Sequence, residues 1–135
     1  LIYFGYSFCP DVCPIDNARN AAAVDILADE GYSVTPVFIT VDPARDTVEV
    51  VSDYTENFHP KMIGLTGNDE QIADAASAYR VLYSAQDDDP EYYLVSHTVL
   101  TYLTLPDVGF VDFFRREDSP QKMADRVACI LDIAA

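Results

Sequence analysis

Apolar and polar positions change along the chain in a regular rhythm that predicts alternating strands and helices. Short apolar or β-branched runs predict buried strands, and longer stretches with apolar residues at helical spacing predict helices. The predicted strands are Leu1–Phe4, Thr35–Val41, Met62–Leu65, His97–Leu105 and Phe110–Phe114. The predicted helices are Ile15–Asp29, Asp46–Phe58, Asn68–Tyr83 and a last one that starts at Ser119-Pro120.

Local signals support several of these boundaries. Gly31 ends the first helix, and Asn68 with a Gln three residues later is typical of a capping box. The turn residues from Pro106 to Gly109 predict a hairpin between the last two strands. The acidic segment Ser84–Tyr92 is predicted to be an exposed loop; no Gly-containing loop with a closing Glu follows it, so it does not predict a calcium site.

This order of elements predicts the α/β class. Parallel strands joined by helices, followed by an antiparallel hairpin and a closing helix, require a central mixed sheet flanked by helices on both faces. That is the order of a thioredoxin-like fold. With 135 residues the chain has room for one domain, so residues 1–135 are expected to form a single thioredoxin-like domain. Because a strand opens the chain without an initiator Met, we expect a native N-terminal segment and any membrane anchor to be missing.

Charge narrows the possible partners. The chain has 23 acidic and 8 basic residues and a net charge of −15. This balance argues against nucleic acid and against anionic lipid surfaces, because neither phosphates nor lipid headgroups would be neutralised. The acidic surface is expected to be solvated, with steering of a cation or a basic partner as the alternative.

The chemistry with the strongest signal lies directly after the first strand, where Cys9 and Cys13 are separated by three residues. Pro14 is tolerated only in the first turn of a helix, so the helix is expected to begin near Asp11–Cys13, with Cys9 in the loop. A thiolate at a helix N-terminus is stabilised by the dipole. In such sheets the site lies beyond the carboxyl ends of the strands. At this spacing the thiols can form a disulfide or hold one soft metal ion.

The positions of the remaining cysteine, methionine and histidine residues indicate which of them could be a further metal ligand. Cys129 falls in the apolar pattern of the last helix and is expected to be buried, as are Met62 and Met123. His59 follows a helix and is expected to be solvated. His97 opens the strand predicted to lie beside the first, so it is the better candidate for a third ligand.

Two thiolates and one imidazole suit Cu(I) best, and Cu(II) could bind with a further oxygen ligand. Structural zinc would normally require a fourth protein ligand.

Four segments, Tyr3–Pro14, Phe38–Thr47, Ile63–Gly67 and Ala78–Val81, resemble the Sco/SenC family of copper chaperones in the same order. The resemblance implies that Cys9, Cys13 and His97 bind copper and that Asp42 supports the site. It implies a partner, the cytochrome c oxidase subunit that carries the copper A site, which receives copper or has its cysteines reduced. Other copper carriers or thiol reductases are further possible partners.

The resemblance also implies a location and reveals one departure. Family members are anchored and face the bacterial periplasm or, as the less favoured alternative here, the mitochondrial intermembrane space. The family often has Asp immediately before the histidine, where this chain has Ser96. The ligand set is intact, and affinity or redox behaviour would differ only if that Asp tunes the site.

The main alternative is a thiol–disulfide oxidoreductase that uses Cys9 and Cys13 without an obligatory metal. Ordinary thioredoxin-like reductases have a two-residue spacer and a cis-proline opposite the thiols. This chain has a three-residue spacer, and Tyr93–Leu100 contains no proline. A thiol peroxidase, a purely stabilising disulfide and a purely structural module are less favoured, so the chain is expected to be mainly a metallochaperone, with reductase activity left open.

Overall fold

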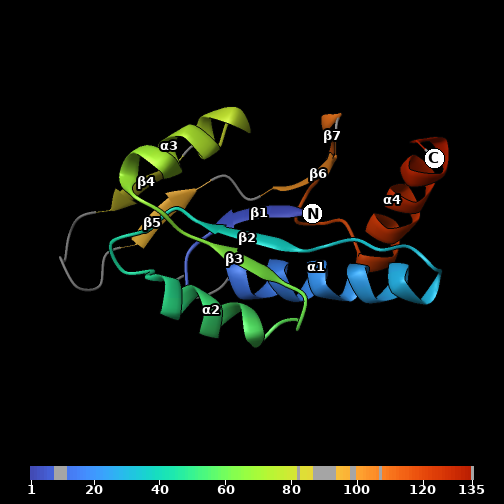
Figure 1. Cartoon of the computed structure of the whole chain (residues 1–135), viewed down its shortest axis with the longest axis horizontal. Coiled ribbons are helices and arrows are strands. Elements are labelled where there is room, and N and C mark those ends of the chain that lie inside the picture. The colour runs from blue at the N-terminus through green and yellow to red at the C-terminus, as the bar shows by residue number, and fades with distance from the viewer. Residues whose placement is uncertain (8–11, 82, 87–93, 98–99, 107, 135) are drawn as a thin grey trace.

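The computed structural model describes residues 1–7, 12–81, 83–86, 94–97, 100–106 and 108–134, and for residues 12–13, 83–86, 94–97 and 134 it describes the backbone alone (Figure 1). The strands are β1 (Ile2–Gly5), β2 (Val37–Thr40), β3 (Ile63–Leu65), β4 (Tyr83–Gln86), β5 (Leu94–His97), β6 (Thr101–Leu105) and β7 (Gly109–Phe114). The helices are α1 (Val12–Asp29), α2 (Val48–Glu56), α3 (Asp69–Ala78) and α4 (Pro120–Ala134).

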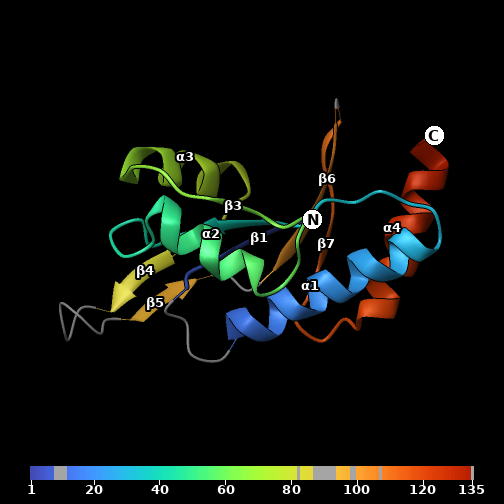
Figure 2. The same cartoon turned by 60° about the horizontal axis from the view of Figure 1, so that its bottom comes forward.

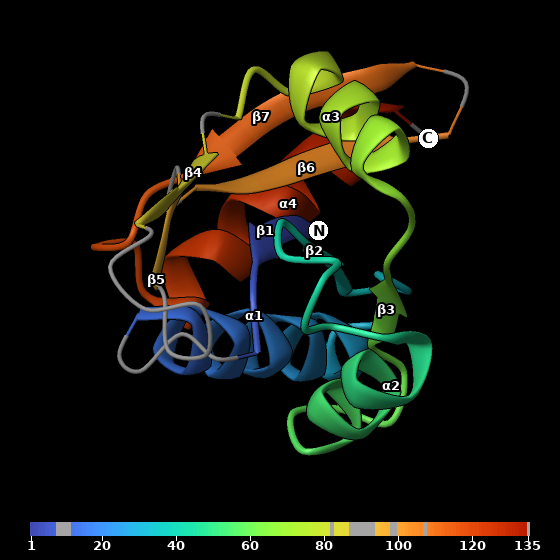
Figure 3. The same cartoon turned by 90° about the vertical axis from the view of Figure 1, so that its left-hand side faces the viewer.

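Five strands form the main sheet in the order β3-β2-β1-β6-β7. β1, β2 and β3 are parallel, whereas β6 is antiparallel to both β1 and β7. Helices α1 and α2 cover one face and α3 covers the other, and α4 packs beside α1 (Figures 2 and 3). The predicted class, a thioredoxin-like mixed sheet with helices on both faces, is therefore confirmed.

Two apolar clusters hold the layers together. One is centred on Tyr3, Phe4 and Phe38, which are fully buried, and includes residues of α2 and α3. The other joins α1 to α4 around Leu27 and Met123. Burial of large side chains of this kind contributes about 1.5–3 kcal/mol each. The predicted core positions of Met62 and Met123 are confirmed.

Most predicted boundaries are right to within three residues. The Asn68 side chain accepts a hydrogen bond from the Gln71 backbone and the Gln71 side chain accepts one from the Asn68 backbone, which completes the capping box of α3. The Ser119 hydroxyl accepts from the Lys122 backbone at the start of α4. After α1, Gly31 adopts a φ of 92°, a left-handed conformation that suits glycine at a helix end.

The region after α3 differs from the prediction. The helix ends at Ala78 rather than continuing to Tyr83, because Arg80 adopts a left-handed φ of 56° and the Val81 amide bonds back to the Ala76 carbonyl. Tyr83–Gln86 then forms β4, so the first three residues of the predicted loop Ser84–Tyr92 belong to a strand. The rest of that loop lies outside the described residues.

The predicted strand His97–Leu105 is also wrong at its start. Leu94–His97 forms β5, which pairs with β4 in a separate two-stranded sheet, and β6 begins at Thr101. No helix in the described part of the chain is both long and apolar enough to cross a membrane.

Candidate metal centre

The cysteine pair follows β1 at the carboxyl end of the parallel strands. Cys9 lies outside the described residues. The backbone of Cys13 lies in the first turn of α1, which begins at Val12, so the predicted helix start is confirmed. In Figure 1 the first turns of α1 and α2 lie at the end toward which β1 and β2 point.

His97 reaches the same end of the sheet by a different route from the one predicted. It closes β5 instead of opening the strand beside β1. That neighbouring strand is β6, in which Thr101 pairs with Tyr3 of β1 in antiparallel register. Because the two strands are antiparallel, the first residue of β6 lies nearer the carboxyl end of β1 than the rest of β6 does, and His97 is four residues before it in the sequence. β5 lies at this end of the molecule in Figure 1.

Asp42 follows β2 and is 4% exposed. Its Oδ2 accepts a hydrogen bond from Arg45 Nε at 2.5 Å. The guanidinium carbon of Arg45 lies 5.8 Å from the centre of the Tyr6 ring, within the range of a cation–π contact. Tyr6 is three residues before Cys9. The Asp42–Arg45 pair therefore packs against the start of the segment between β1 and α1 that contains Cys9, the cysteine loop.

Asp46 lies next to this pair and is fully buried. Its Oδ2 accepts from the Ser7 amide at 3.0 Å and from the Thr40 hydroxyl at 2.6 Å. Its Oδ1 accepts from the Ser7 hydroxyl. The Asp46 carbonyl oxygen accepts from the Thr66 hydroxyl at 2.8 Å. Residues at or just after the ends of β1, β2 and β3 thus bind the side chain or the backbone carbonyl of Asp46.

Polar groups also fix α1 beneath the sheet. Asp16, one helical turn after Cys13, is 1% exposed, and its carboxylate accepts from the Tyr3 hydroxyl at 2.8 Å. Arg19 is 8% exposed and donates to the Thr101 hydroxyl of β6 at 3.0 Å and to the Arg115 carbonyl. These bonds set the position of the helix that carries Cys13 relative to β1 and β6.

Known proteins match nearly the whole length of the chain. A sequence model of the SCO1/SenC family matches residues 1–132. Protein SenC of Rhodobacter capsulatus is 55% identical over 132 residues, which is 98% of this chain and 60% of that protein. The chain belongs to the SCO1/SenC family.

Solved structures similar to this SCO1/SenC chain include copper-bound proteins of plant, yeast and bacterial origin. Copper-bound ScoI of Arabidopsis thaliana is 42% identical, with a TM-score of 0.92 over 97% of this chain and 82% of that one. Copper-bound yeast Sco1 is 36% identical, with a TM-score of 0.91 over 97% and 74%. The chain spans 60% of Protein SenC and 38% of an Arabidopsis mitochondrial SCO1 homologue.

The donor types in this SCO1/SenC chain suit copper. Within the described residues, no three His, Cys, Asp or Glu side chains form a group that could hold a metal ion. The candidate ligands remain the predicted Cys9, Cys13 and His97, whose side chains lie outside the described part of the structure. Two thiolates and an imidazole form a soft, low-coordinate set of the kind that Cu(I) prefers.

Two other residues differ from their predictions. Cys129, expected to be buried, is exposed on α4. His59, expected to be solvated, is 8% exposed. Its Nδ1 accepts from the Lys61 amide at 3.0 Å, so Nε2 carries the proton and donates to Asp25 at 2.8 Å. His59 thus links the end of α2 to α1, with both ring nitrogens engaged.

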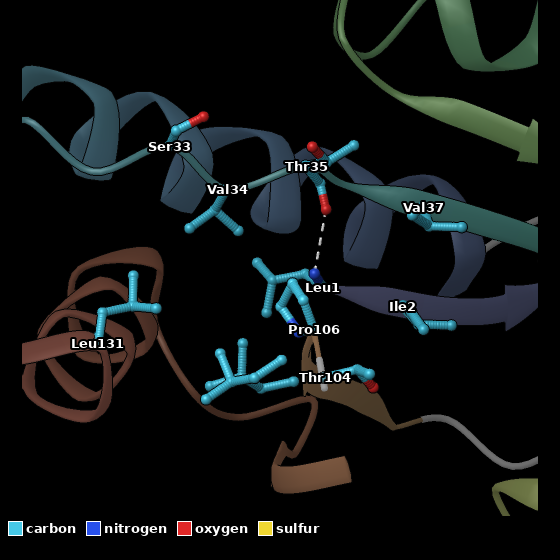
Figure 4. Close-up of a pocket in the computed structure, with 11 residues that line it drawn as sticks. Leu1, Ile2, Ser33, Val34, Thr35, Val37, Thr104, Pro106 and Leu131 are labelled. Atoms are coloured by element: carbon cyan, nitrogen blue, oxygen red, sulfur yellow. Dashed lines mark hydrogen bonds between the residues drawn. The ribbon is translucent and has the colours of Figure 1, made fainter. Parts of the chain in front are cut away.

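A cavity of about 420 Å³ lies at the start of β1, opposite the cysteine end (Figure 4). Its walls include Leu1, Val34, Pro106 and Leu131. The backbone nitrogen of Leu1 donates to the Thr35 carbonyl at 3.1 Å. The cavity is mainly apolar in its lining and lies apart from the candidate ligands.

Proposed function

We propose that this protein is a copper chaperone that binds one copper ion through Cys9, Cys13 and His97. The observation that carries the proposal is the match over 97% of the chain to copper-bound Arabidopsis ScoI and yeast Sco1. In support, the first turn of α1, which contains Cys13, and β5, which ends at His97, lie at the end of the molecule toward which β1 points, and Cys9 is four residues after β1 in the sequence. This is the end of a parallel sheet where ligand sites are found.

The chain's own residues would perform distinct tasks in this process. The first turn of α1 presents Cys13 at the positive end of an 18-residue helix, which favours the thiolate required for metal binding. The Asp42–Arg45 pair supports the segment before Cys9 through the Tyr6 ring. Copper is the cargo, and its destination in this proposal is the copper A site of a cytochrome c oxidase subunit.

The same pair supports a second role, reduction of cysteines in the target. A Cys13 thiolate at a helix N-terminus is suited to exchange. In that reaction one thiolate of the pair attacks a target disulfide and forms a mixed disulfide. The second thiolate then releases the target dithiol, and Cys9 and Cys13 become a disulfide. Two electrons pass to the target, and the resulting disulfide cannot bind copper.

The location of the whole protein is also a proposal. Relatives include the bacterial Protein SenC and mitochondrial SCO proteins of plants and mammals. We place this chain on the periplasmic side of a bacterial inner membrane, as one domain of a protein with an anchor elsewhere in its sequence. The bacterial relative is the more similar, at 55% identity against 44% for the Arabidopsis protein.

The test is the copper content of the fully reduced protein together with a count of free thiols. The parent should bind one copper per chain, and Cys9→Ser and Cys13→Ser should each lose tight binding. Cys129→Ser is the matched control, because Cys129 is a free, exposed thiol on α4, and it should keep full stoichiometry. Retention of copper by Cys9→Ser and Cys13→Ser, or its loss in Cys129→Ser, would contradict the proposed site.

A further inference from the structure

The side chain of Asp46 connects the cysteine loop to the sheet. A fully buried carboxylate is costly unless hydrogen bonds satisfy it, and three donors converge on this one. Two of the three come from Ser7, through its amide and its hydroxyl. Charge-assisted hydrogen bonds of this kind are about twice as strong as neutral ones.

The position of Ser7 gives these bonds a consequence for the site. Ser7 is two residues after the end of β1 and two residues before Cys9. Its amide and hydroxyl both point to Asp46, so its backbone and side chain are each fixed at the entrance to the cysteine loop. The bonds span 39 residues of sequence and join this entrance to the turn between β2 and α2.

That turn is itself well anchored. The Asp46 amide donates to the Asp42 carbonyl at 2.9 Å, and the Thr40 hydroxyl accepts from the Asp42 amide at 3.0 Å. Thr66, just after β3, donates to the Asp46 carbonyl. Hydrogen bonds to residues at the ends of β2 and β3 therefore fix the position of Asp46. Of the residues that bond to its side chain, Ser7 is the one that leads into the cysteine loop.

We propose that Asp46 is a positioning residue that acts through Ser7 to hold Cys9 in the conformation required for copper binding. This inference rests on the proposed function. Asp46 does not touch the metal in this account. It reduces the conformational freedom of the loop before copper binds, so that less ordering entropy is lost on binding.

The variants separate positioning from general stability. Ser7→Ala removes the hydroxyl bond, and Ser7→Thr retains it. Asp46→Asn replaces one acceptor oxygen with a donor. Thr40→Val is the matched control, because at nearly constant volume it removes the hydroxyl that donates to the same carboxylate and accepts from the Asp42 amide, and it leaves both Ser7 bonds in place. Three quantities are measured: Cu(I) affinity by chelator competition, the reduction potential of the Cys9–Cys13 disulfide, and the thermal midpoint.

Ser7→Ala and Asp46→Asn should weaken Cu(I) binding by about tenfold, the equivalent of the ordering entropy of roughly one residue. Ser7→Thr should bind like the parent. Thr40→Val should lower the thermal midpoint while its copper affinity stays within about twofold of the parent. Equal copper affinities in Ser7→Ala, Asp46→Asn and Thr40→Val would overturn the positioning role.

Copper binding by the unsubstituted parent protein tests the proposed function, and the variants test the role of Asp46. If the parent binds no copper, the proposed function fails, and the disulfide potential then decides the role of Asp46. A potential shifted in Ser7→Ala and Asp46→Asn but not in Thr40→Val would support positioning of the cysteine pair. Potentials that shift equally in all three, or in none, would overturn it.

Discussion

At the scale of single residues, two buried aspartates in the turn between β2 and α2, Asp42 and Asp46, accept hydrogen bonds from residues near the candidate site. Asp42 accepts from Arg45, and Asp46 accepts from Ser7 and Thr40. The sequence reveals Asp42 as a candidate through the resemblance to Sco/SenC proteins. The role of Asp46 cannot be predicted from sequence, because its partner Ser7 is 39 residues away and no spacing pattern records that contact.

The Asp42–Arg45 pair leads to a prediction about stability. Arg45→Met keeps an unbranched apolar stem but removes the guanidinium that the 4% exposed carboxylate of Asp42 faces. Loss of a charged partner at a buried carboxylate should lower the free energy of unfolding by about 1–3 kcal/mol. Urea unfolding measures this change. Arg116→Met, at an exposed arginine, is the control and should leave stability almost unchanged; a similar loss in both variants would contradict the importance of the pair.

The sequence predicts the surroundings of the cysteines correctly in one case and wrongly in another. Pro14, next to Cys13, correctly predicts a helix that begins near Asp11–Cys13, because proline is tolerated only in a first turn. For Cys129 the apolar pattern predicts burial, yet the described side chain is exposed. The neighbouring Met123 and Val127 occupy the buried stripe of α4, and position 129 lies off it.

At the scale of elements, β3 and α2 pack so closely at Gly64 that no side chain fits between them. A Cβ at Gly64 would lie 2.3 Å from Val51 Cγ1 and 2.9 Å from Thr55 Cγ2. Gly64→Ala should therefore separate helix and strand and lower stability by about 1–3 kcal/mol. The thermal midpoint of the purified variant checks this directly.

A double variant tests the stated cause. In Gly64→Ala/Val51→Ala the nearest obstructing methyl group is absent, so the combined loss should be smaller than the sum of the two single losses. Additive losses would show that the β3–α2 contact is not the reason for the glycine.

Element boundaries show where sequence patterns fail. The apolar spacing continues through Tyr79 and Val81, so it predicts a helix to Tyr83. The helix stops because Arg80 adopts the left-handed conformation that usually belongs to glycine. β4 and β5 have four residues each and pair only with one another, so neither has a pattern long enough to be recognised. The resulting shift moves His97 from the start of one strand to the end of another.

At the scale of the whole molecule, the fold class and the chain order of the four helices and the five main-sheet strands follow from sequence, because strand–helix alternation leaves few topologies for a parallel sheet; the small β4–β5 sheet does not follow from it. The sequence correctly predicts that Cys13 lies in the first turn of the helix after β1, whereas it predicts His97 at the start of the strand beside β1 and the structure has it at the end of β5. The side-chain arrangement of the ligands remains a prediction, since it concerns Cys9, Cys13 and His97, whose side chains lie outside the described part of the structure.

Net charge gives a prediction for the molecule as a whole. At −15, repulsion among carboxylates should destabilise the compact state, and added salt should screen it. We expect the thermal midpoint to rise when NaCl increases from about 10 mM to about 1 M, where the Debye length falls from about 30 Å to 3 Å. A midpoint that falls or stays constant over this range would show that the acidic groups are already compensated.

The most direct test of the central claim is the Cu(I) affinity of His97→Ala, measured by competition with a chelator under reducing conditions. His59→Gln is the matched control, because His59 is buried against Asp25 and Lys61, away from the cysteine end. The account predicts that His97→Ala loses at least about 100-fold in affinity, as expected for a lost metal ligand, while His59→Gln binds like the parent. Equal affinity in His97→Ala and the parent would contradict a Cys9–Cys13–His97 copper site.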